Sequence, residues 1–144
     1  MAPENKISYY SLRLKELLNS SFPELAGDNK FIEQRGQFAA KVYNDAFIAG
    51  NTIEQSNEIA QYVLFEGLHF SKFDTVFKVV CNEFDTIMAD EELRPFALKM
   101  LPVCIPVFEQ YQITDDFTES QEFEWLYTEI TGTIQIWIED NGLQ

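Results

Sequence analysis

The stretch SKFDTVFKVVCNEFDTI, residues 71–87, decides the fold class of this chain. Its large apolar residues recur at steps of four, three, four and three, at Phe73, Phe77, Val80, Phe84 and Ile87. This spacing follows the helical period of about 3.6 residues and places one apolar stripe on one side of a helix. Ser71 stands at the N-cap position, and Asp74 lies in the first turn, where an acid is favoured by the helix dipole. We therefore predict an amphipathic helix that begins after Ser71.

The residues before this stretch predict three further helices. Ser8 is expected to cap the first, which runs to about residue 19, and Asp28 to cap the second, over about 29–49. Thr52 and Gln55 have the spacing of a capping box for the third. The expected buried positions of the first helix are Tyr9, Leu12 and Leu17.

Two helices are predicted after residue 87. Asp90 opens the first of them, which contains Pro95, Pro102 and Pro106 and ends before Tyr111. A proline inside a helix removes a hydrogen-bond donor, so we expect this helix to be bent or interrupted.

The last helix is expected to begin after a cap at Thr118 or Ser120 and to run toward Asp140. Its Ile134–Ile138 segment also alternates like a strand. We favour a helix here, because a lone strand in a helical chain would lack a partner for its backbone groups.

These elements predict an all-α fold: a single-domain multihelical bundle of about six helices, one of them interrupted or kinked by prolines. The length of 144 residues suits one domain with one core, so residues 1–144 are taken as a single helical domain.

The charge of the chain is unevenly distributed. The formal net charge is −14, and residues 1–100 carry 15 acids and 10 bases, a net charge of −5. The rest of the chain carries no base and nine acids: Glu109, Asp115, Asp116, Glu119, Glu122, Glu124, Glu129, Glu139 and Asp140. Such a field repels phosphate, which argues against direct binding of nucleic acid or an anionic membrane, and it attracts a basic protein surface. Solubility is the preferred explanation for the excess of acid, and a functional acidic face is the alternative.

Cellular context follows from the cysteines and the N-terminus. Cys81 and Cys104 lie among apolar residues and are expected to be buried free thiols, which suits a cytoplasmic protein. The first residues show no apolar signal core, and no apolar stretch approaches the length of about 20 residues that a membrane-spanning helix needs.

Several segments resemble a family of small proteins of unknown function from Bacteroidetes. They are ISYY (residues 7–10), EGLHFSKFDT (66–75), NEF (82–84) and LYTEITGTIQI (126–136). The resemblance spans nearly the whole chain. It implies an all-helical protein whose gene is often linked to conjugative or other mobile elements, and it implies no activity, cofactor or site residue.

No motif in the sequence assembles a catalytic or cofactor site, and we expect no cofactor and no metal. His69 is the only histidine, and it is expected to bond a backbone group or cap the third helix. A metal-dependent enzyme remains an alternative, with Asp115, Asp116 and Glu119, or Glu122 and Glu124, as conceivable ligands.

Two interior glycines, Gly36 and Gly132, are expected to allow close helix packing; the alternative is that a ligand or partner approaches the backbone there. The preferred function is a non-enzymatic accessory or protein-interaction factor whose acidic C-terminal surface binds a basic protein. A self-associating structural protein is the other alternative. The candidate residues for contact with a partner are Trp125, Asp115, Asp116, Glu119, Glu122 and Glu124. For Trp125 the preferred alternative is a place in the core or single exposure on the surface.

Overall fold

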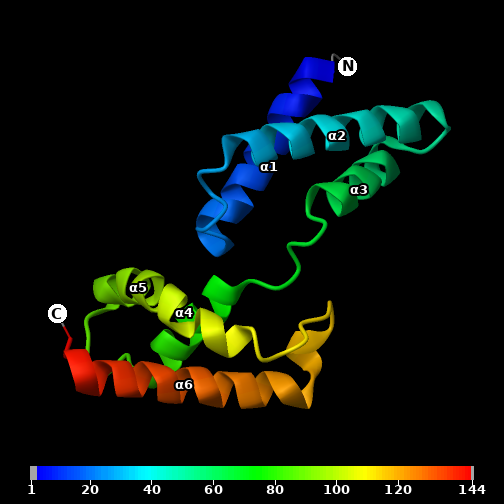
Figure 1. Cartoon of the computed structure of the whole chain (residues 1–144). Helices are drawn as coiled ribbons and strands as arrows, with labels where there is room; N and C mark the ends of the chain where they lie inside the picture. Colours follow the sequence, from blue (N-terminus) through cyan, green and yellow to red (C-terminus); the bar gives the residue numbers. More distant parts are fainter. Residues whose placement is uncertain (1–2, 144) are drawn as a thin grey trace. The chain divides into compact units, whose positions relative to one another are not determined.

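The structure is a computed structural model that describes residues 3–143, and within that range it consists of helices and connecting segments (Figure 1). The elements in chain order are α1 (Pro3–Ser21), α2 (Asn29–Ile48), α3 (Ile53–Leu64), α4 (Lys72–Glu83), α5 (Asp90–Phe108), the 3-10 helix η1 (Phe117–Glu119) and α6 (Gln121–Asn141). The predicted all-α fold with about six helices is confirmed.

The chain forms two compact units. Unit 1 (Met1–His69) contains α1, α2 and α3, and unit 2 (Phe70–Gln144) contains α4, α5, η1 and α6. Each unit has its own cluster of buried hydrophobic side chains, where the sequence pattern predicts one core. Periodicity shows that a helix has an apolar side but not which helix covers it. That residues 1–144 form a single domain stays a prediction.

In unit 1, helix α2 packs against both α1 and α3. The caps predicted for these two helices are confirmed: the Asp28 side chain accepts a hydrogen bond from the Phe31 N–H, and Thr52 forms the capping box with Gln55. Gly36 lies at the contact between α1 and α2, where a Cβ would lie 3.2 Å from the backbone nitrogen of Ser11. The close packing predicted at Gly36 is therefore confirmed.

The prediction for α1 is wrong in its start and in its buried side. The helix begins before Ser8, so this residue is an interior position rather than a cap. The side chains of Tyr9 and Leu12 are exposed. The residues buried instead are Tyr10, Leu14 and Leu18, which recur every four residues. A hydrogen bond also favours burial of this side of α1: the Tyr10 hydroxyl donates to Asn57 Oδ1 at 2.8 Å.

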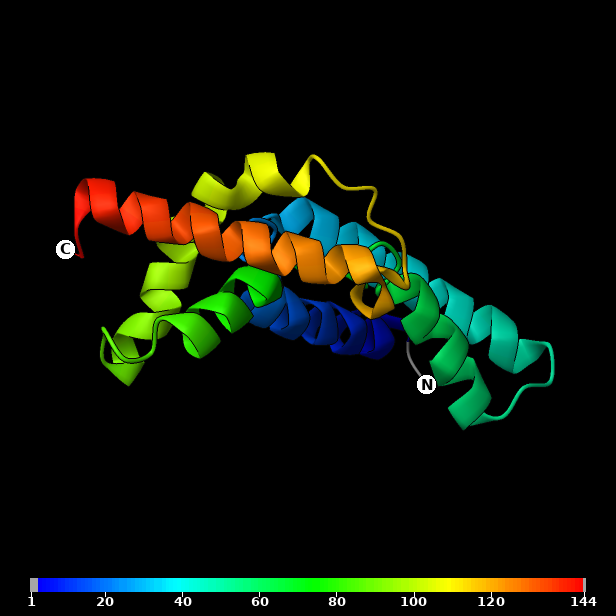
Figure 2. The same cartoon turned by 90° about the horizontal axis from the view of Figure 1, so that it is seen from below.

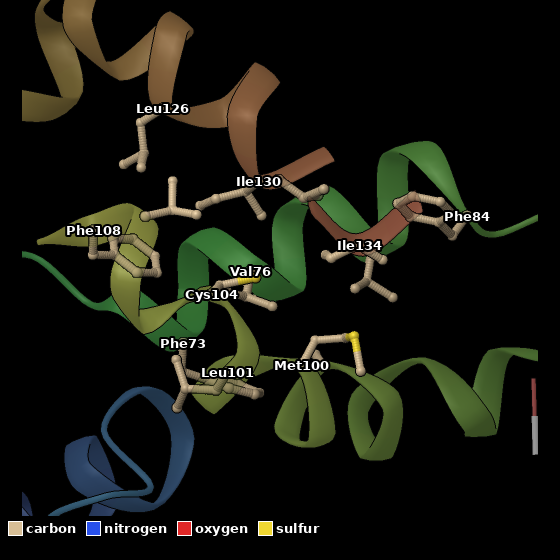
Figure 3. Packing of buried hydrophobic residues seen from close by; sticks show 14 of the residues in the cluster. Phe73, Val76, Phe84, Met100, Leu101, Cys104, Phe108, Leu126, Ile130 and Ile134 are labelled. Atoms are coloured by element: carbon tan, nitrogen blue, oxygen red, sulfur yellow. The ribbon is translucent and has the colours of Figure 1, made fainter. Parts of the chain in front are cut away.

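In unit 2, each of the helices α4, α5 and α6 packs against the other two (Figure 1). Ser71 caps α4 as predicted, since its side chain accepts from the Asp74 N–H. The predicted stripe is confirmed as far as Phe84, but α4 ends at Glu83 and Ile87 is exposed. Figure 3 shows side chains from all three helices meeting in this core. The core residues labelled there are Phe73, Val76, Phe84, Met100, Leu101, Cys104, Phe108, Leu126, Ile130 and Ile134.

Helix α5 runs from Asp90 to Phe108 without an interruption, although it contains all three prolines. Pro102 and Pro106 lack the N–H that would bond four residues back, and the ribbon of α5 changes direction along its length (Figure 2). Helix α6 begins after Ser120, whose side chain accepts from the Phe123 N–H. The segment Ile134–Ile138 is helical, which removes the strand alternative.

Candidate functional site

The six residues predicted to contact a partner are all exposed, and they lie around the beginning of α6. Asp115 and Asp116 belong to the loop that precedes η1, and Glu119 is the last residue of η1. Glu122 and Glu124 are in the first turn of α6, where acids are favoured by the helix dipole. Trp125 follows them, and 55% of its surface is exposed, which is unusual for so large an apolar side chain.

Two of these acids line an open pocket that also contains a base. Glu119 and Glu124 share this pocket with Lys78 of α4 and with Tyr127. The Lys78 ammonium lies 5.6 Å from the centre of the Phe123 ring, and Gln121 Nε2 donates a hydrogen bond to Glu124 at 2.8 Å. Lys78 partly offsets the negative charge here. This side of α6 is therefore the less acidic of the two.

Glu122 lies on the opposite side of α6, with Trp125 between the two sides. Residues three, four and seven positions apart share one side of a helix, so Glu122, Trp125 and Glu129 are neighbours. The Tyr111 hydroxyl donates a hydrogen bond to Glu129. Partial burial, this bond and the charges of Glu129 and Glu122 raise the pKa of Tyr111 to about 12. Tyr111 is therefore close to both carboxylates, and α6 carries no basic residue on this side.

The exposed side of α6 continues along the whole helix, and we call it the outer face of α6. Trp125, Gly132 and Ile136 run along its middle, and Ile136 is 60% exposed. Helical spacing places acids on both flanks of this line. One flank carries Glu122, Glu129 and Asp140, and the other carries Glu124 and Glu139. The outer face therefore has an apolar middle and acidic edges.

Gly132 corrects one expectation. A Cβ at this position would meet no atom of the described residues within 4 Å, so unit 2 shows no close packing at Gly132. This differs from Gly36, where Ser11 occupies the space. An interior glycine weakens a helix by up to about 1 kcal/mol relative to alanine. Among the described residues nothing packs against Gly132 to compensate for this loss of helix stability, which leaves the alternative that a partner approaches the backbone.

The C-terminal end of α6 also departs from the usual placement of charge. Glu139 and Asp140 lie in the last turn, and this turn contains no basic residue. The C-terminal end of a helix carries partial negative charge, so acids there are unfavourable by roughly 0.3–1 kcal/mol each when exposed. Gln135 Nε2 donates a hydrogen bond to Glu139 at 3.3 Å but supplies no positive charge.

The sequence pattern did not single out Glu129, Gly132, Ile136, Glu139 and Asp140 as one surface with Trp125. A helical period drawn from Trp125 instead of from the buried residues would have found them, because they lie 4, 7, 11, 14 and 15 positions after Trp125 and so fall on the same side of a helix.

His69 does not cap α3. It is exposed and lines an open pocket with Arg13 and Glu16. The end of α3 is capped by Arg35 of α2, whose Nη1 donates to the carbonyl oxygens of Val63, Leu64 and Glu66 at 3.3, 3.1 and 2.8 Å. A guanidinium reaches several carbonyl groups at once and carries the positive charge that a helix C-terminus favours.

The described residues include few side chains suited to nucleophilic or metal chemistry. Both cysteines are free, and burial raises the pKa of the Cys104 thiol to about 12. Cys81 is only half-buried. Within residues 3–143, no three side chains of His, Cys, Asp or Glu converge in a way that would hold a metal ion. In the same range no helix combines the length and the apolar character needed to cross a membrane.

Fold and surface together define a small all-helical protein with an acidic, partly apolar face on its last helix. The chain belongs to the family described as "Domain of unknown function (DUF1896)", whose model matches residues 2–143. It is similar to the crystal structure of protein PG0816 from Porphyromonas gingivalis: 37% of residues are identical, 99% of this chain and 97% of that chain are covered, and the TM-score is 0.86. No curated protein matches the chain. The predicted membership in a family of unknown function is confirmed, and the similar structure comes from a Bacteroidetes species, whereas the link to mobile elements stays a prediction.

Proposed function

We propose that the protein is a non-enzymatic accessory factor whose outer face of α6 binds a basic protein in the cytoplasm. The observation that carries this proposal is the arrangement of that face. Acids flank an exposed apolar line that contains Trp125 and Ile136, and the chain has no Lys, Arg or His after Lys99. An apolar centre with a charged rim is the usual anatomy of a protein–protein interface.

Charge favours a protein over nucleic acid or membrane as the direct partner. The acids of the outer face repel phosphate groups, whereas they would speed the approach of a surface rich in Lys and Arg. A mobile-element factor that binds a DNA-handling protein, imitating the charge of DNA, is one form of this function. In that case the partner contacts DNA, and this protein contacts only the partner.

The position of Glu139 and Asp140 supports a binding role over a purely solubilising one. Solubility needs net charge somewhere on the surface and does not require acids at the helix end where they are least favourable. Local rules are broken most often at functional sites, where another contact compensates. A basic partner would provide that compensation.

Affinity capture from a cytoplasmic extract at low and high salt tests the proposal. The wild-type chain is compared with the triple variant Glu122→Gln, Glu129→Gln, Glu139→Gln. The control, Glu24→Gln, Glu33→Gln, Glu58→Gln, removes the same charge from exposed positions of unit 1. We expect a basic protein that wild type and control retain at low salt and that high salt or the triple variant releases. Equal retention by all three chains would contradict the proposal.

Self-association remains a second candidate because of one exposed apolar group in unit 1. Ile48 ends α2 with 83% of its surface exposed, and Ile53 begins α3 with 59% exposed. Light scattering of the wild type and of Ile48→Lys tests it. A stable dimer that the substitution dissociates would support self-association through this turn, and a monomer in both would remove it.

A further inference from the structure

Gly132 lies at the middle of the outer face of α6, and no described residue occupies the space beside it. We propose that Gly132 is the point at which a helix of the partner, flanked by Lys and Arg, crosses α6. This inference rests on the proposed function and adds the place of contact and the kind of partner segment. Without a side chain at 132, another backbone can approach α6 more closely than at any neighbouring position.

The residues on either side of Gly132 suit a helix that crosses there. Trp125 lies seven residues before it and Ile136 four residues after it, which is about 10 Å and about 6 Å along the axis. Both are exposed, and both share the middle of the outer face with the glycine. A crossing helix would seat its own apolar residues against Trp125 and Ile136 on the two sides of the close contact.

The charge on the two edges of the outer face indicates which charged residues the partner helix carries. Glu122, Glu129 and Asp140 form one edge, and α6 itself carries no Lys, Arg or His beside them. The other edge carries Glu124 and Glu139, and Lys78 offsets part of the charge beside Glu124. A partner helix with Lys and Arg beside its apolar line is complementary to both edges.

The same charges argue against a second copy of this chain as the occupant. Two outer faces brought together would oppose acids with acids on both edges, and like charges across an interface are repulsive. Salt distinguishes the two cases, because screening weakens attraction to a basic helix and relieves repulsion between two acidic faces.

The probe for the test is a synthetic helical peptide with a Leu and Ala line flanked by Lys and Arg, labelled for fluorescence anisotropy. Wild type is compared with Gly132→Gln, which fills the open space with a neutral side chain that a helix tolerates well. The matched control is Gly27→Gln, since a Cβ at Gly27 in unit 1 also meets nothing within 4 Å. Circular dichroism verifies that both variants keep their helices.

We expect Gly132→Gln to weaken binding of this peptide by about tenfold or more, the loss typical of a central contact, and Gly27→Gln to leave it unchanged. If Gly132→Gln binds the peptide as tightly as the wild type, Gly132 is not the crossing point. That result would not affect the proposed function, which is the salt-sensitive binding of a basic partner. Equal binding of a peptide with Glu in place of Lys and Arg would overturn the partner's chemistry. A wild-type dimer that becomes a monomer on Gly132→Gln would show that a second copy occupies this face and would overturn the proposal as well.

Discussion

Gly36 of α2 packs directly against Ser11 of α1. A Cβ added at Gly36 would overlap Ser11 Oγ and would lie 3.2 Å from the Ser11 backbone nitrogen and 3.3 Å from its Cα. The two helices therefore approach each other at a position where only glycine fits without a shift. Gly132, the other interior helical glycine, has open space instead. Two glycines that both lie inside a helix thus have different surroundings.

The contact at Gly36 predicts a loss of stability on the smallest possible substitution. Gly36→Ala should lower the free energy of unfolding by about 1–3 kcal/mol, because the backbone of Ser11 has to move away from the new methyl group. Urea denaturation measures the change. Ser11→Ala in the same background should recover only part of it, since the backbone contacts remain. A Gly36→Ala protein as stable as the wild type would show that the helices separate at little cost.

Replacing Gly132 by alanine should change the free energy of unfolding in the opposite direction. Gly132→Ala should raise the free energy of unfolding by up to about 1 kcal/mol, since alanine favours the helix and the space beside it is empty. The measurement is again the urea midpoint at constant slope. A destabilised Gly132→Ala protein would mean that the position is packed within the chain, and it would remove the reason to assign Gly132 to a partner.

Arg35 is expected to hold the end of α3. Arg35→Met keeps much of the side-chain length and removes the donors to Val63, Leu64 and Glu66, and we expect a loss of about 1–2 kcal/mol because hydrogen bonds from a charged group to partly buried carbonyls disappear. Lys30→Gln, an exposed change on the same helix, is the control. Hydrogen exchange should accelerate at the end of α3. Equal exchange in the two variants would contradict this role for Arg35.

We predict that the buried thiol of Cys104 makes the stability of the fold depend on pH. Burial raises the pKa of its thiol from 9.0 to about 12 in the folded chain, whereas the unfolded chain releases this proton near the ordinary value. Between these values the folded state binds more protons than the unfolded state, so stability is complete below about pH 9 and falls as the pH rises toward 12. Denaturation of wild type and Cys104→Ala at about pH 8 and about pH 10 checks this. The drop should be smaller in Cys104→Ala, and equal drops would exclude the thiol as a source.

The helices could be predicted from the sequence where capping residues and apolar spacing agree. Asp28, Thr52 with Gln55, Ser71 and Ser120 all accept the hydrogen bonds that their positions predict. The start of α1 was missed because the helix begins at Pro3, a residue that suits a first turn as well as a break. Ser8 then resembled a cap although it lies inside the helix.

Long-range relationships could not be predicted in this way. A guanidinium from α2 caps α3, and nothing local to Arg35 or to Glu66 indicates that the two meet. The division of the buried residues into two clusters has the same origin, since spacing gives the apolar side of a helix and not its partner helix.

The candidate surface was predicted in part. Acidity and an exposed Trp125 follow from composition and from the position of Trp125 outside the buried stripe. The grouping of acids into two edges of α6, and the separation of Glu119 and Glu124 beside Lys78 from Glu122, depend on where α4 packs.

The salt dependence of binding to the basic helical peptide tests the central claim most directly. The dissociation constant is measured from about 0.05 M to about 0.3 M salt for the wild type and for the triple variant Glu122→Gln, Glu129→Gln, Glu139→Gln. We predict that the wild-type constant rises steeply with salt and that the triple variant binds more weakly with a shallower dependence. A wild-type dissociation constant that does not change with salt would contradict an acidic docking face on α6. The same dissociation constants for the wild type and the triple variant would contradict it as well.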